Sequence, residues 1–401
     1  MKILFLCHYV PYPPDHGAKI RAYHFIRHLS RNNSVTVATL AHTAGELTQV
    51  IGLKDYCEEV IAEVLRPRVR WLQALRALAS RSPSCVAYFR SAKLQDRIDQ
   101  KLKSGNFDRI VVFCAFMAQY VLEWQGGYRV LDFVDIDSAK WAEYSRCKAF
   151  PLSSGYALEA AKLRNYEYVI SRHFHHCAVI SQGEFEEFER LGVPVPCTIV
   201  PNGVDTDYFN PNGNRQPESS TIVFVGRMDY FPNIDAVLYF TKSVLPIIRE
   251  AVPDVEFRII GSNPTPAIRR LRQIPGVIVT GHVPDVRPFL TDAAVSVAPL
   301  KMARGTQNKV LESMAMGIPV VATSEAAKGV DAIPEQHILI GNTPDAFARQ
   351  VIRILKDRKV RANLSKVGRE RVEQVHSWLR SMEFLDTILN HSNRGLEAVT
   401  R

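Results

Sequence analysis

The chain has 401 residues, of which 46% are hydrophobic and 23% are charged, and its formal net charge is +9. This composition is typical of a globular protein, and the length exceeds what one ordinary hydrophobic core holds, so we expect two domains. The excess of basic residues indicates an anionic partner, which could be nucleic acid, a membrane surface or a phosphorylated substrate.

The seven cysteines are odd in number, scattered, and without the spacing of a metal site, which indicates free thiols in a reducing compartment. The first residues, "MKILFLCHYVPYPP", contain a short apolar run that stops at prolines, so we interpret it as a first strand and not as a signal peptide. No run reaches the roughly 20 apolar residues of a membrane span. We therefore expect a cytoplasmic protein that is at most peripherally attached to the inner face of the plasma membrane.

The first half of the chain alternates between strand-length and helix-length segments. The strand-length apolar runs are "KILFLC", "SVTVATL", "DRIVVF", "RVLDFV" and "CAVI". Between them lie longer segments such as "AKIRAYHFIRHL" and "YALEAAKLRNYEYVISRHF". This alternation predicts a parallel sheet covered by helices.

Within this half, residues 64–105 carry ten Lys and Arg against two Asp. An apolar stripe lies there beside basic residues: Trp71, Leu72, Leu75 and Leu78 next to Arg70, Arg76 and Arg81. The pattern fits an interfacial helix that is drawn to anionic lipid. It equally fits a helix that packs on the sheet and exposes a basic face. We expect no nucleic-acid partner, because no nucleic-acid-binding module is present and aromatic residues are sparse.

The region of residues 200–220 is rich in Pro, Asn and Gly and forms the best domain boundary. A second series of apolar runs follows: "TIVFVG", "VEFRIIG", "GVIVTG", "AAVSVAP" and "IPVVAT". We therefore predict an α/β fold of two Rossmann-like domains that face each other across a cleft. The domains are residues 1–203 and 204–375. An amphipathic helix follows in residues 376–401; it could cross back to the first domain, but its pattern alone does not show what it packs on.

Residues 299–323 leave one predicted strand, pass a turn, form a helix and enter the next strand. Ligands of parallel sheets lie beyond the carboxyl ends of strands, so the loop of residues 300–307 belongs to a binding edge. Gly305 permits close approach of the backbone to a ligand. The free N–H groups of Thr306, Gln307 and Asn308 would form an anion site at the helix start.

Three polar residues share one side of this helix: Asn308, Lys309 and Glu312. A phosphate at the helix start would meet Lys309, and Glu312, one turn deeper, suits a pair of sugar hydroxyls. Together with the amides they predict a clamp for a nucleotide diphosphate. The same spacing also fits an ordinary amphipathic helix with a solvated Lys–Glu face.

These segments resemble a known family. The run "GTQNKVLESMAMGIPVVAT" resembles the nucleotide-sugar segment of retaining GT-B glycosyltransferases of family 4, the group 1 glycosyltransferases. In the family's order, "IVPNGVDTDYF" is similar to its hinge, "IVFVGRM" to the phosphate-contacting turn of its second domain, and "VTGHVPDV" to the turn beside the base. The segments "PYPPDHGAKIRAYHF" and "VDIDSAKW" resemble sugar transferases that accompany exopolysaccharide and exosortase systems.

The resemblance implies roles on both sides of the donor diphosphate. Gly226 and Arg227 would face one side of it, and Lys309 with the amides of residues 305–308 would hold the other. Arg227 and Lys309 would then stabilise the charge that grows on the leaving diphosphate, so we expect no tightly bound metal or other cofactor. In retaining members of the family the leaving phosphate itself deprotonates the acceptor.

Further roles follow for the sugar, the base and the acceptor. Glu312 would bind the ribose hydroxyls or the donor sugar, His282 would lie beside the base, and Gly17 would line the cleft between donor and acceptor. Asp135 and Asp137 match a metal-binding Asp-x-Asp pattern of the other large glycosyltransferase fold, which the two βα series do not fit. We interpret them either as residues that orient the acceptor hydroxyl, or as part of a helix cap made by Asp137 or Ser138.

The chain departs from the family at two places. Arg304 stands where the family has a glutamate, eight residues before Glu312. Pro232 and Asn233 stand where the family has a lysine, five or six residues after Arg227. Lys309 would supply the missing cation, whereas the lost acid leaves recognition of the donor sugar open.

The sequence thus predicts a glycosyltransferase that moves a sugar from a UDP- or GDP-sugar to a glycan or a polyisoprenyl-linked acceptor. Transfer would retain the anomeric configuration and serve exopolysaccharide or glycoconjugate biosynthesis. Two alternatives remain open: a nucleotide-sugar epimerase of similar fold, and a non-catalytic module that binds nucleotide sugars or membranes.

Overall fold

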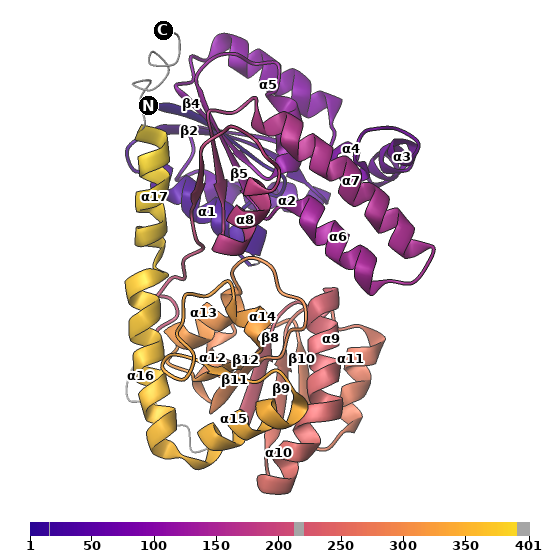
Figure 1. The fold of residues 1–401 in the computed structure, drawn as a ribbon. Helices are drawn as coiled ribbons and strands as arrows, with labels where there is room; N and C mark the ends of the chain where they lie inside the picture. The colour runs from indigo at the N-terminus through magenta and orange to yellow at the C-terminus, as the bar shows by residue number, and fades with distance from the viewer. Residues whose placement is uncertain (16, 212–219, 391–401) are drawn as a thin grey trace. The chain divides into compact units, whose positions relative to one another are not determined.

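The computed structural model describes residues 1–15, 17–211 and 220–390. The chain divides into two compact units, one of Met1–Pro201 with the segment that begins at Ser381, the other of Asn202–Arg380. Each unit holds one sheet of parallel strands flanked by helices (Figure 1). The predicted α/β class with two Rossmann-like βα units is therefore confirmed, while the cleft between them stays a prediction.

The first unit is built on a seven-stranded sheet in the order β3-β2-β1-β4-β5-β6-β7. The strands are β1 (Lys2–Cys7), β2 (Ser34–Ala41), β3 (Glu59–Val64), β4 (Arg109–Phe113), β5 (Tyr128–Val134), β6 (His176–Val179) and β7 (Cys197–Ile199). All pairs are parallel; in the centre of the sheet Ile3 pairs with Val35 of β2 and with Arg109 of β4. The central strands are buried on both faces, which explains their nearly continuous apolar runs.

The helices of this unit are α1 (Gly17–Leu29), α2 (Ala44–Gln49), α3 (Pro67–Leu78), α4 (Ser84–Tyr88), α5 (Ala92–Ser104), α6 (Asp137–Cys147), α7 (Leu152–Ser171) and α8 (Gln182–Glu189). Short 3-10 turns occupy Val50–Leu53 and Ala115–Tyr120. A buried ion pair joins α1 to the sheet, because the Arg21 guanidinium donates to Asp132 of β5 at 2.7 and 3.1 Å. Arg21 also donates to the carbonyl of Val200 at 2.7 Å, which anchors the end of the unit.

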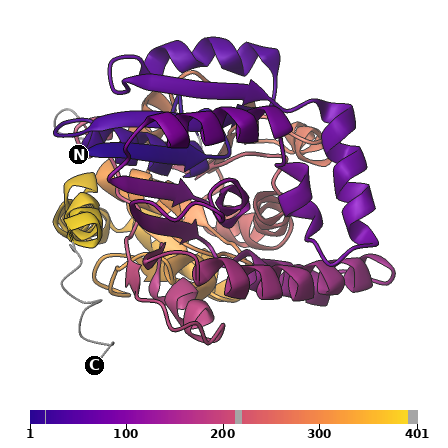
Figure 2. The ribbon, with the colours of Figure 1, turned by 90° about the horizontal axis from the view of Figure 1, so that it is seen from above.

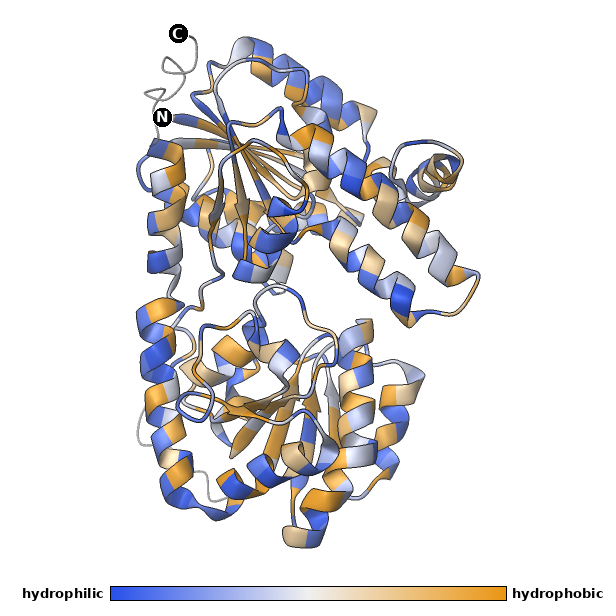
Figure 3. Cartoon of the chain, in the orientation of Figure 1, coloured by the Kyte–Doolittle hydropathy of each residue, from blue (hydrophilic) through white to orange (hydrophobic). Residues whose placement is uncertain are grey.

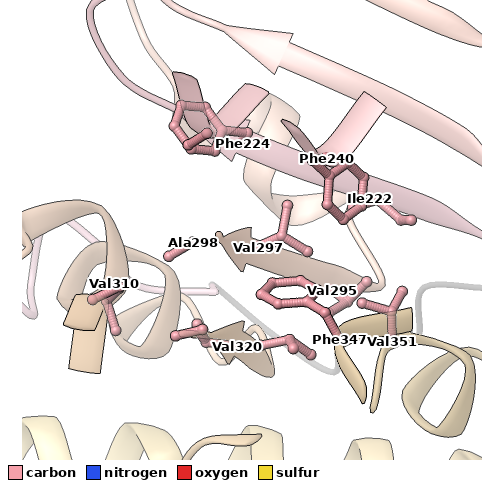
Figure 4. Close-up of a cluster of buried hydrophobic side chains, with 14 of the residues drawn as sticks. Ile222, Phe224, Phe240, Val295, Val297, Ala298, Val310, Val320, Phe347 and Val351 are labelled. Atoms are coloured by element: carbon pink, nitrogen blue, oxygen red, sulfur yellow. The ribbon is translucent and has the colours of Figure 1, made fainter. Parts of the chain in front are cut away.

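The second unit has a six-stranded sheet in the order β10-β9-β8-β11-β12-β13. Its strands are β8 (Thr221–Val225), β9 (Glu256–Ile260), β10 (Val277–Gly281), β11 (Val295–Ala298), β12 (Val320–Ala322) and β13 (Leu339–Ile340). One large apolar cluster covers this sheet. Figure 4 shows Ile222 and Phe224 of β8 with Val295 and Val297 of β11, next to Phe347.

The helices of the second unit are α9 (Phe231–Tyr239), α10 (Leu245–Ala251), α11 (Pro266–Arg270), α12 (Arg287–Thr291), α13 (Asn308–Ala315), α14 (Ser324–Ala327), α15 (Pro344–Lys356) and α16 (Arg358–Val375). A π-helical turn, Phe240–Val244, joins α9 to α10, and a 3-10 turn, Leu271–Gln273, follows α11. α15 places its apolar side, Phe347, Ala348, Val351 and Ile354, in the core. That side fixes how the helix lies on the sheet.

The last helix, α17 (Trp378–Asn390), starts in the second unit and ends in the first. It is amphipathic, as the alternating hydropathy along it shows (Figure 3). Within the first unit Asp386 lies 2.9 Å from Nε2 of His28 on α1, and Arg109 donates to the carbonyl of Leu389 at 2.9 Å. The end of α17 is therefore part of the first unit. In the described part of the chain no helix is both long and apolar enough to cross a membrane.

Candidate functional site

The sheet of the second unit reverses its direction of growth between β8 and β11. From β8 the chain adds β9 and β10 on one side, and from β11 it adds β12 and β13 on the other. In open parallel sheets, ligands bind beyond the carboxyl ends of the strands at such a switch point. The segments that leave these two strand ends are Gly226–Arg227 and residues 299–307, which are the segments that the sequence predicts.

Asn233, near the start of α9, connects these two segments. Its side-chain Nδ2 donates to the carbonyl of Arg227 at 2.9 Å, and its Oδ1 accepts a hydrogen bond from Nζ of Lys309. The Lys309 ammonium also lies 4.6 Å from the ring centroid of Phe224. Asn233 itself is buried, and both hydrogen bonds are partly buried. The structure therefore brings Lys309 against the turn that contains Gly226 and Arg227.

Asn233 also explains the glycine at position 226. A Cβ added to Gly226 would lie 2.7 Å from Asn233 Nδ2, closer than side-chain carbons are found. The sequence marks Asn233 only as a departure from the family pattern. Its role as a partner of Lys309 was missed, because these residues lie 76 positions apart in the chain.

Lys309 and Glu312 lie on the same side of α13 and shift each other's titration. Burial lowers the pKa of Lys309 to about 7, and the nearby Glu312 carboxylate opposes this shift. Burial likewise raises the pKa of Glu312 to about 7, against the opposing charge of Lys309. An anionic ligand beside Lys309 would favour its charged form. Both residues are partly exposed, so they are neither fully buried nor the freely solvated Lys–Glu face that the spacing also allowed.

The start of α13 differs by one detail from the prediction. The helix begins at Asn308 with Gln307 as its N-cap, so Thr306 and Gln307 precede the helix instead of opening it. The Gln307 side chain makes no capping hydrogen bond to the helix; its Nε2 instead donates to the carbonyl of Arg304 at 2.9 Å. The first amide groups of α13 thus remain available for an anion. Asn308 is held by a hydrogen bond from buried Asn202, at 3.2 Å.

Gly305 and Thr306 shape the loop before this helix. Gly305 has φ +59°, a left-handed conformation that favours glycine. Its carbonyl packs against Gly329, where an added Cβ would come within 1.9 Å of the Gly305 oxygen. The Thr306 hydroxyl is buried and has no hydrogen-bond partner among the described residues. The backbone conformation is thus sufficient to explain Gly305 without a ligand.

Arg227 is held beside the switch point by an acidic neighbour. Its guanidinium forms a two-pronged ion pair with Asp229, at 2.8 and 3.1 Å, and Asn263 also donates to Asp229. The Arg227 hydrogen bonds hold the pKa of Asp229 below its usual range. Since Arg227 is half-exposed, a diphosphate would have to compete with Asp229 for it.

The two remaining donor-side residues lie further from this cluster along the sheet or the loop. His282 is exposed and directly follows β10, the edge strand, two strands away from β8. Arg304 lies in the loop after β11 and accepts the Gln307 hydrogen bond with its carbonyl. The structure does not bring His282 into contact with Lys309 or Arg227, so its place beside the base stays a prediction.

The predicted acceptor-side residues belong to the first unit. Gly17 is exposed and begins α1, and Asp135 and Asp137 follow β5. Asp137 is buried at the first position of α6, 3.6 Å from the Lys140 ammonium. Val134, directly before Asp135, has φ +66°, which is strained for a β-branched residue. Strain of this kind gathers at functional sites, which fits a role for this strand end.

The predicted alternative, a helix cap made by Asp137 or Ser138, is wrong. The N-cap of α6 is Ile136, whose amide donates to Glu184 at 2.7 Å, while the amide of Ser138 donates to Glu167 at 3.0 Å. Two carboxylates from α7 and α8 thus occupy the start of this helix. No sequence pattern points to these carboxylates, because they lie 29 and 48 residues from the amides that they bind.

The described residues contain no group of three or more His, Cys, Asp or Glu side chains that could hold a metal ion.

Comparison with known proteins agrees with this geometry. Residues 219–357 match the family model described as "Glycosyl transferases group 1". No curated protein sequence matches the chain. Among solved structures, sucrose-phosphate synthase from Thermosynechococcus elongatus has a TM-score of 0.70 at 17% identity and covers 96% of this chain and 98% of its own.

Two further structures align over nearly the full length. HepE from Anabaena, in complex with UDP and glucose, has a TM-score of 0.68 at 14% identity, over 98% of this chain and 100% of its own. A mutant of S. aureus TarM in complex with fondaparinux, alpha-GlcNAc-glycerol and UDP has a TM-score of 0.66 at 10% identity, over 97% and 99%. These likenesses show the fold. With a group 1 glycosyl transferase domain in its second unit and the two Rossmann-like units of the GT-B fold, the chain is a glycosyltransferase.

Proposed function

We propose that the protein transfers a sugar from a UDP- or GDP-sugar to a glycan or lipid-linked acceptor, with retention of configuration. The observation that carries the proposal is the convergence of Lys309, the Arg227 turn and the uncapped start of α13 at the switch point of the second sheet. HepE and TarM support the choice of a nucleotide ligand, because their structures contain UDP.

In this reaction the bond from the anomeric carbon to the phosphate oxygen breaks, and negative charge grows on the departing diphosphate. Lys309 and the amides of α13 would hold this charge from one side and Arg227 from the other. The acceptor oxygen bonds to the anomeric carbon on the same face, and its proton passes to the leaving phosphate. Glu312 would accept hydrogen bonds from sugar hydroxyls, and no step needs a tightly bound metal.

Asp135 and Asp137 of the first unit are proposed to orient the acceptor hydroxyl, with Gly17 near it. We place the reaction in the cytoplasm, in the synthesis of an exopolysaccharide or related glycoconjugate, as in the systems that the sequence resembles. All seven cysteines are free thiols, which suits a reducing compartment.

The proposal is tested by incubating the purified chain with labelled UDP- and GDP-sugars, together with glycan acceptors or a bacterial lipid extract. Label that moves into the glycan or lipid supports transfer, and the anomeric coupling constant of the product reports retention. Lys309→Ala and Glu312→Ala should abolish transfer, with unchanged circular dichroism. Normal turnover in either variant would refute the site.

The same experiment separates the two alternatives. An epimerase would convert the donor without an acceptor and release a free product. A non-catalytic module would bind the donor saturably without turnover on any acceptor.

A further inference from the structure

We propose that the first unit docks on anionic lipid through a surface formed by α3 and the turn between α6 and α7. The exposure of its apolar side chains and the charge of its basic ones support this docking independently of the sugar-transfer reaction. The sequence suggested residues 64–105 as a membrane region; the structure narrows that region to α3 and adds the α6–α7 turn, residues 148–151, which the sequence did not indicate.

The two sides of α3 are arranged in the reverse of an ordinary amphipathic helix. The residues that face the protein are small, Ala74 and Ala77, which are 8% and 5% exposed. The large apolar residues face outward: Trp71 at 59%, Leu72 at 54%, Leu75 at 59% and Leu78 at 51% exposure. A soluble surface helix buries its large apolar side, so this outward stripe indicates a partner that is itself apolar.

A basic residue of the same helix is turned inward, which leaves the exposed side apolar. Arg70 contacts Nδ1 of His42 at 3.2 Å and lies 4.9 Å over the ring of Tyr88. The sequence also allowed a helix that exposes a basic face, but the structure shows an apolar face with arginines around it.

The α6–α7 turn continues this surface. Phe150 in the turn is 82% exposed, and Leu152, the first residue of α7, is 62% exposed. Lys162 of α7 donates to the carbonyls of Ala77 and Leu78 at 2.9 Å, which ties α7 to the end of α3. Figures 1 and 2 both show α3 and the α6–α7 turn on the same side of the first unit. We call these two segments the apolar ledge.

The charges around the apolar ledge select anionic lipid as the occupant. Residues 64–95 contain no Asp or Glu, and Arg66, Arg76 and Arg81 around the stripe are exposed. Arg146 adds another exposed cation beside the turn. An apolar stripe with arginines at its margin lies at the boundary of headgroups and acyl chains, where the arginines meet lipid phosphates.

The apolar ledge lies near the edge of the first sheet at which ligands are expected to bind. His42 directly follows β2, so its contact with Arg70 places α3 beside the carboxyl ends of the strands of the first sheet. Ligands of parallel sheets bind at this edge. A lipid surface held there would lie next to an acceptor site of the first unit, which favours a lipid-linked acceptor over a free glycan.

The test uses the full chain and vesicles of phosphatidylglycerol with phosphatidylcholine, or of phosphatidylcholine alone. We expect co-sedimentation with the anionic vesicles that weakens as salt increases. The double variant Leu72→Ser and Leu75→Ser should lower the partition coefficient by about tenfold or more. Replacing Arg76 and Arg81 by Glu should lower it by at least about fivefold per residue.

Matched controls lie elsewhere on the first unit. Ile51→Ser changes another exposed apolar residue and Lys103→Glu another exposed cation, and both should leave vesicle binding unchanged. The emission of Trp71 should shift to the blue on binding, and this shift should vanish in Trp71→Phe.

Several outcomes would overturn the proposal. One is that the ledge variants partition into vesicles as well as the parent does, and another is that neutral and anionic vesicles bind the chain equally. A third is that the parent forms a dimer in solution and the Leu72→Ser and Leu75→Ser substitutions dissociate it. The last result would assign the ledge to a second copy of the chain. Vesicle binding without any sugar transfer would refute only the proposed reaction, and transfer without vesicle binding would refute only the docking.

Discussion

Asn233 occupies the place where the resembling family has a lysine, and its amide supports Lys309, which comes from a different element. The sequence predicted that Lys309 and Glu312 share one side of a helix, because spacing within a helix fixes which residues are neighbours. It could not predict the link to Asn233, since contacts between distant segments depend on how the sheet orders its strands.

The substitution Asn233→Ala tests this support. It would remove the hydrogen-bond acceptor of the Lys309 ammonium and the side-chain donor to the Arg227 carbonyl, which both lie in partly buried hydrogen bonds. We expect the free energy of unfolding to fall by about 1–3 kcal/mol, and UDP affinity to fall by about tenfold, through a displaced Lys309. Denaturant titration and calorimetry measure both quantities. Exposed Asn363→Ala is the control, and an unchanged UDP affinity in Asn233→Ala would contradict the role.

Glu167 provides a second test at the residue scale. The side chain is fully buried, and burial raises its pKa from 4.5 to about 8. Between these values the folded protein keeps the proton and the unfolded chain has lost it. The free energy of unfolding should therefore fall as pH rises through this window and become flat above it.

Glu167→Gln should remove this component of the pH dependence, because the amide still accepts from the Ser138 backbone and does not titrate. Relative to the parent, the variant should gain on the order of 1.4 kcal/mol of stability for each pKa unit of the shift as pH rises from 5 to 9. Denaturant titrations across this range measure the difference. Parallel curves for parent and variant would show that Glu167 is ionised in the folded protein.

Among the elements, the buried apolar strands were predictable, and the half-exposed strands β3 and β7 at the sheet edges were not. β1, β8 and β11 are buried on both faces, so their sequences are continuous apolar runs. β3 lies at one edge of the sheet and carries Glu59 and Glu63. β7 lies at the other edge, directly before residues 200–220, which the sequence assigned to the domain boundary. β7 has only three residues and all of them are partly exposed, so its pattern does not distinguish it from a loop.

The strand ends of the second sheet are packed so closely that glycine is required. Gly261, after β9, has φ +152°, and an added Cβ would lie 1.7 Å from the carbonyl oxygen of Gly226. Gly261→Ala should therefore lower the free energy of unfolding by about 3 kcal/mol or more and impair UDP binding through the displaced Gly226 turn.

Gly155 in α7 is the matched control, since nothing lies within 4 Å of an added Cβ there. Gly155→Ala should stabilise the protein by up to about 1 kcal/mol, because alanine is the better helix former. Thermal unfolding of the parent and of both variants measures these changes in stability. A Gly261→Ala variant as stable as the parent would show that the strand-end turn is not tightly packed.

At the scale of the molecule, the two series of βα segments predicted two units, and the order of motifs predicted the GT-B fold. The end of α17 could not be placed from sequence, because amphipathic residues show only that a helix packs on something. In the structure Leu385 and Ile388 are each 1% exposed, in the segment assigned to the first unit.

Truncating these side chains tests whether α17 stabilises the protein as a core element. Leu385→Ala or Ile388→Ala should cost about 2–5 kcal/mol of unfolding free energy, as for other buried apolar residues. Phe384→Ala, at a position 36% exposed, should cost much less. Equal losses at the three positions, measured by denaturant titration, would contradict this packing.

The central claim is that the start of α13, with Lys309, binds the diphosphate of the donor nucleotide. Isothermal titration calorimetry of UDP and GDP against the parent, Lys309→Ala and Glu312→Ala tests it most directly. We expect one site on the parent and a loss of affinity of about tenfold or more in Lys309→Ala, because a partly buried charge-assisted contact disappears. UDP and GDP affinities that are unchanged in Lys309→Ala would contradict the account.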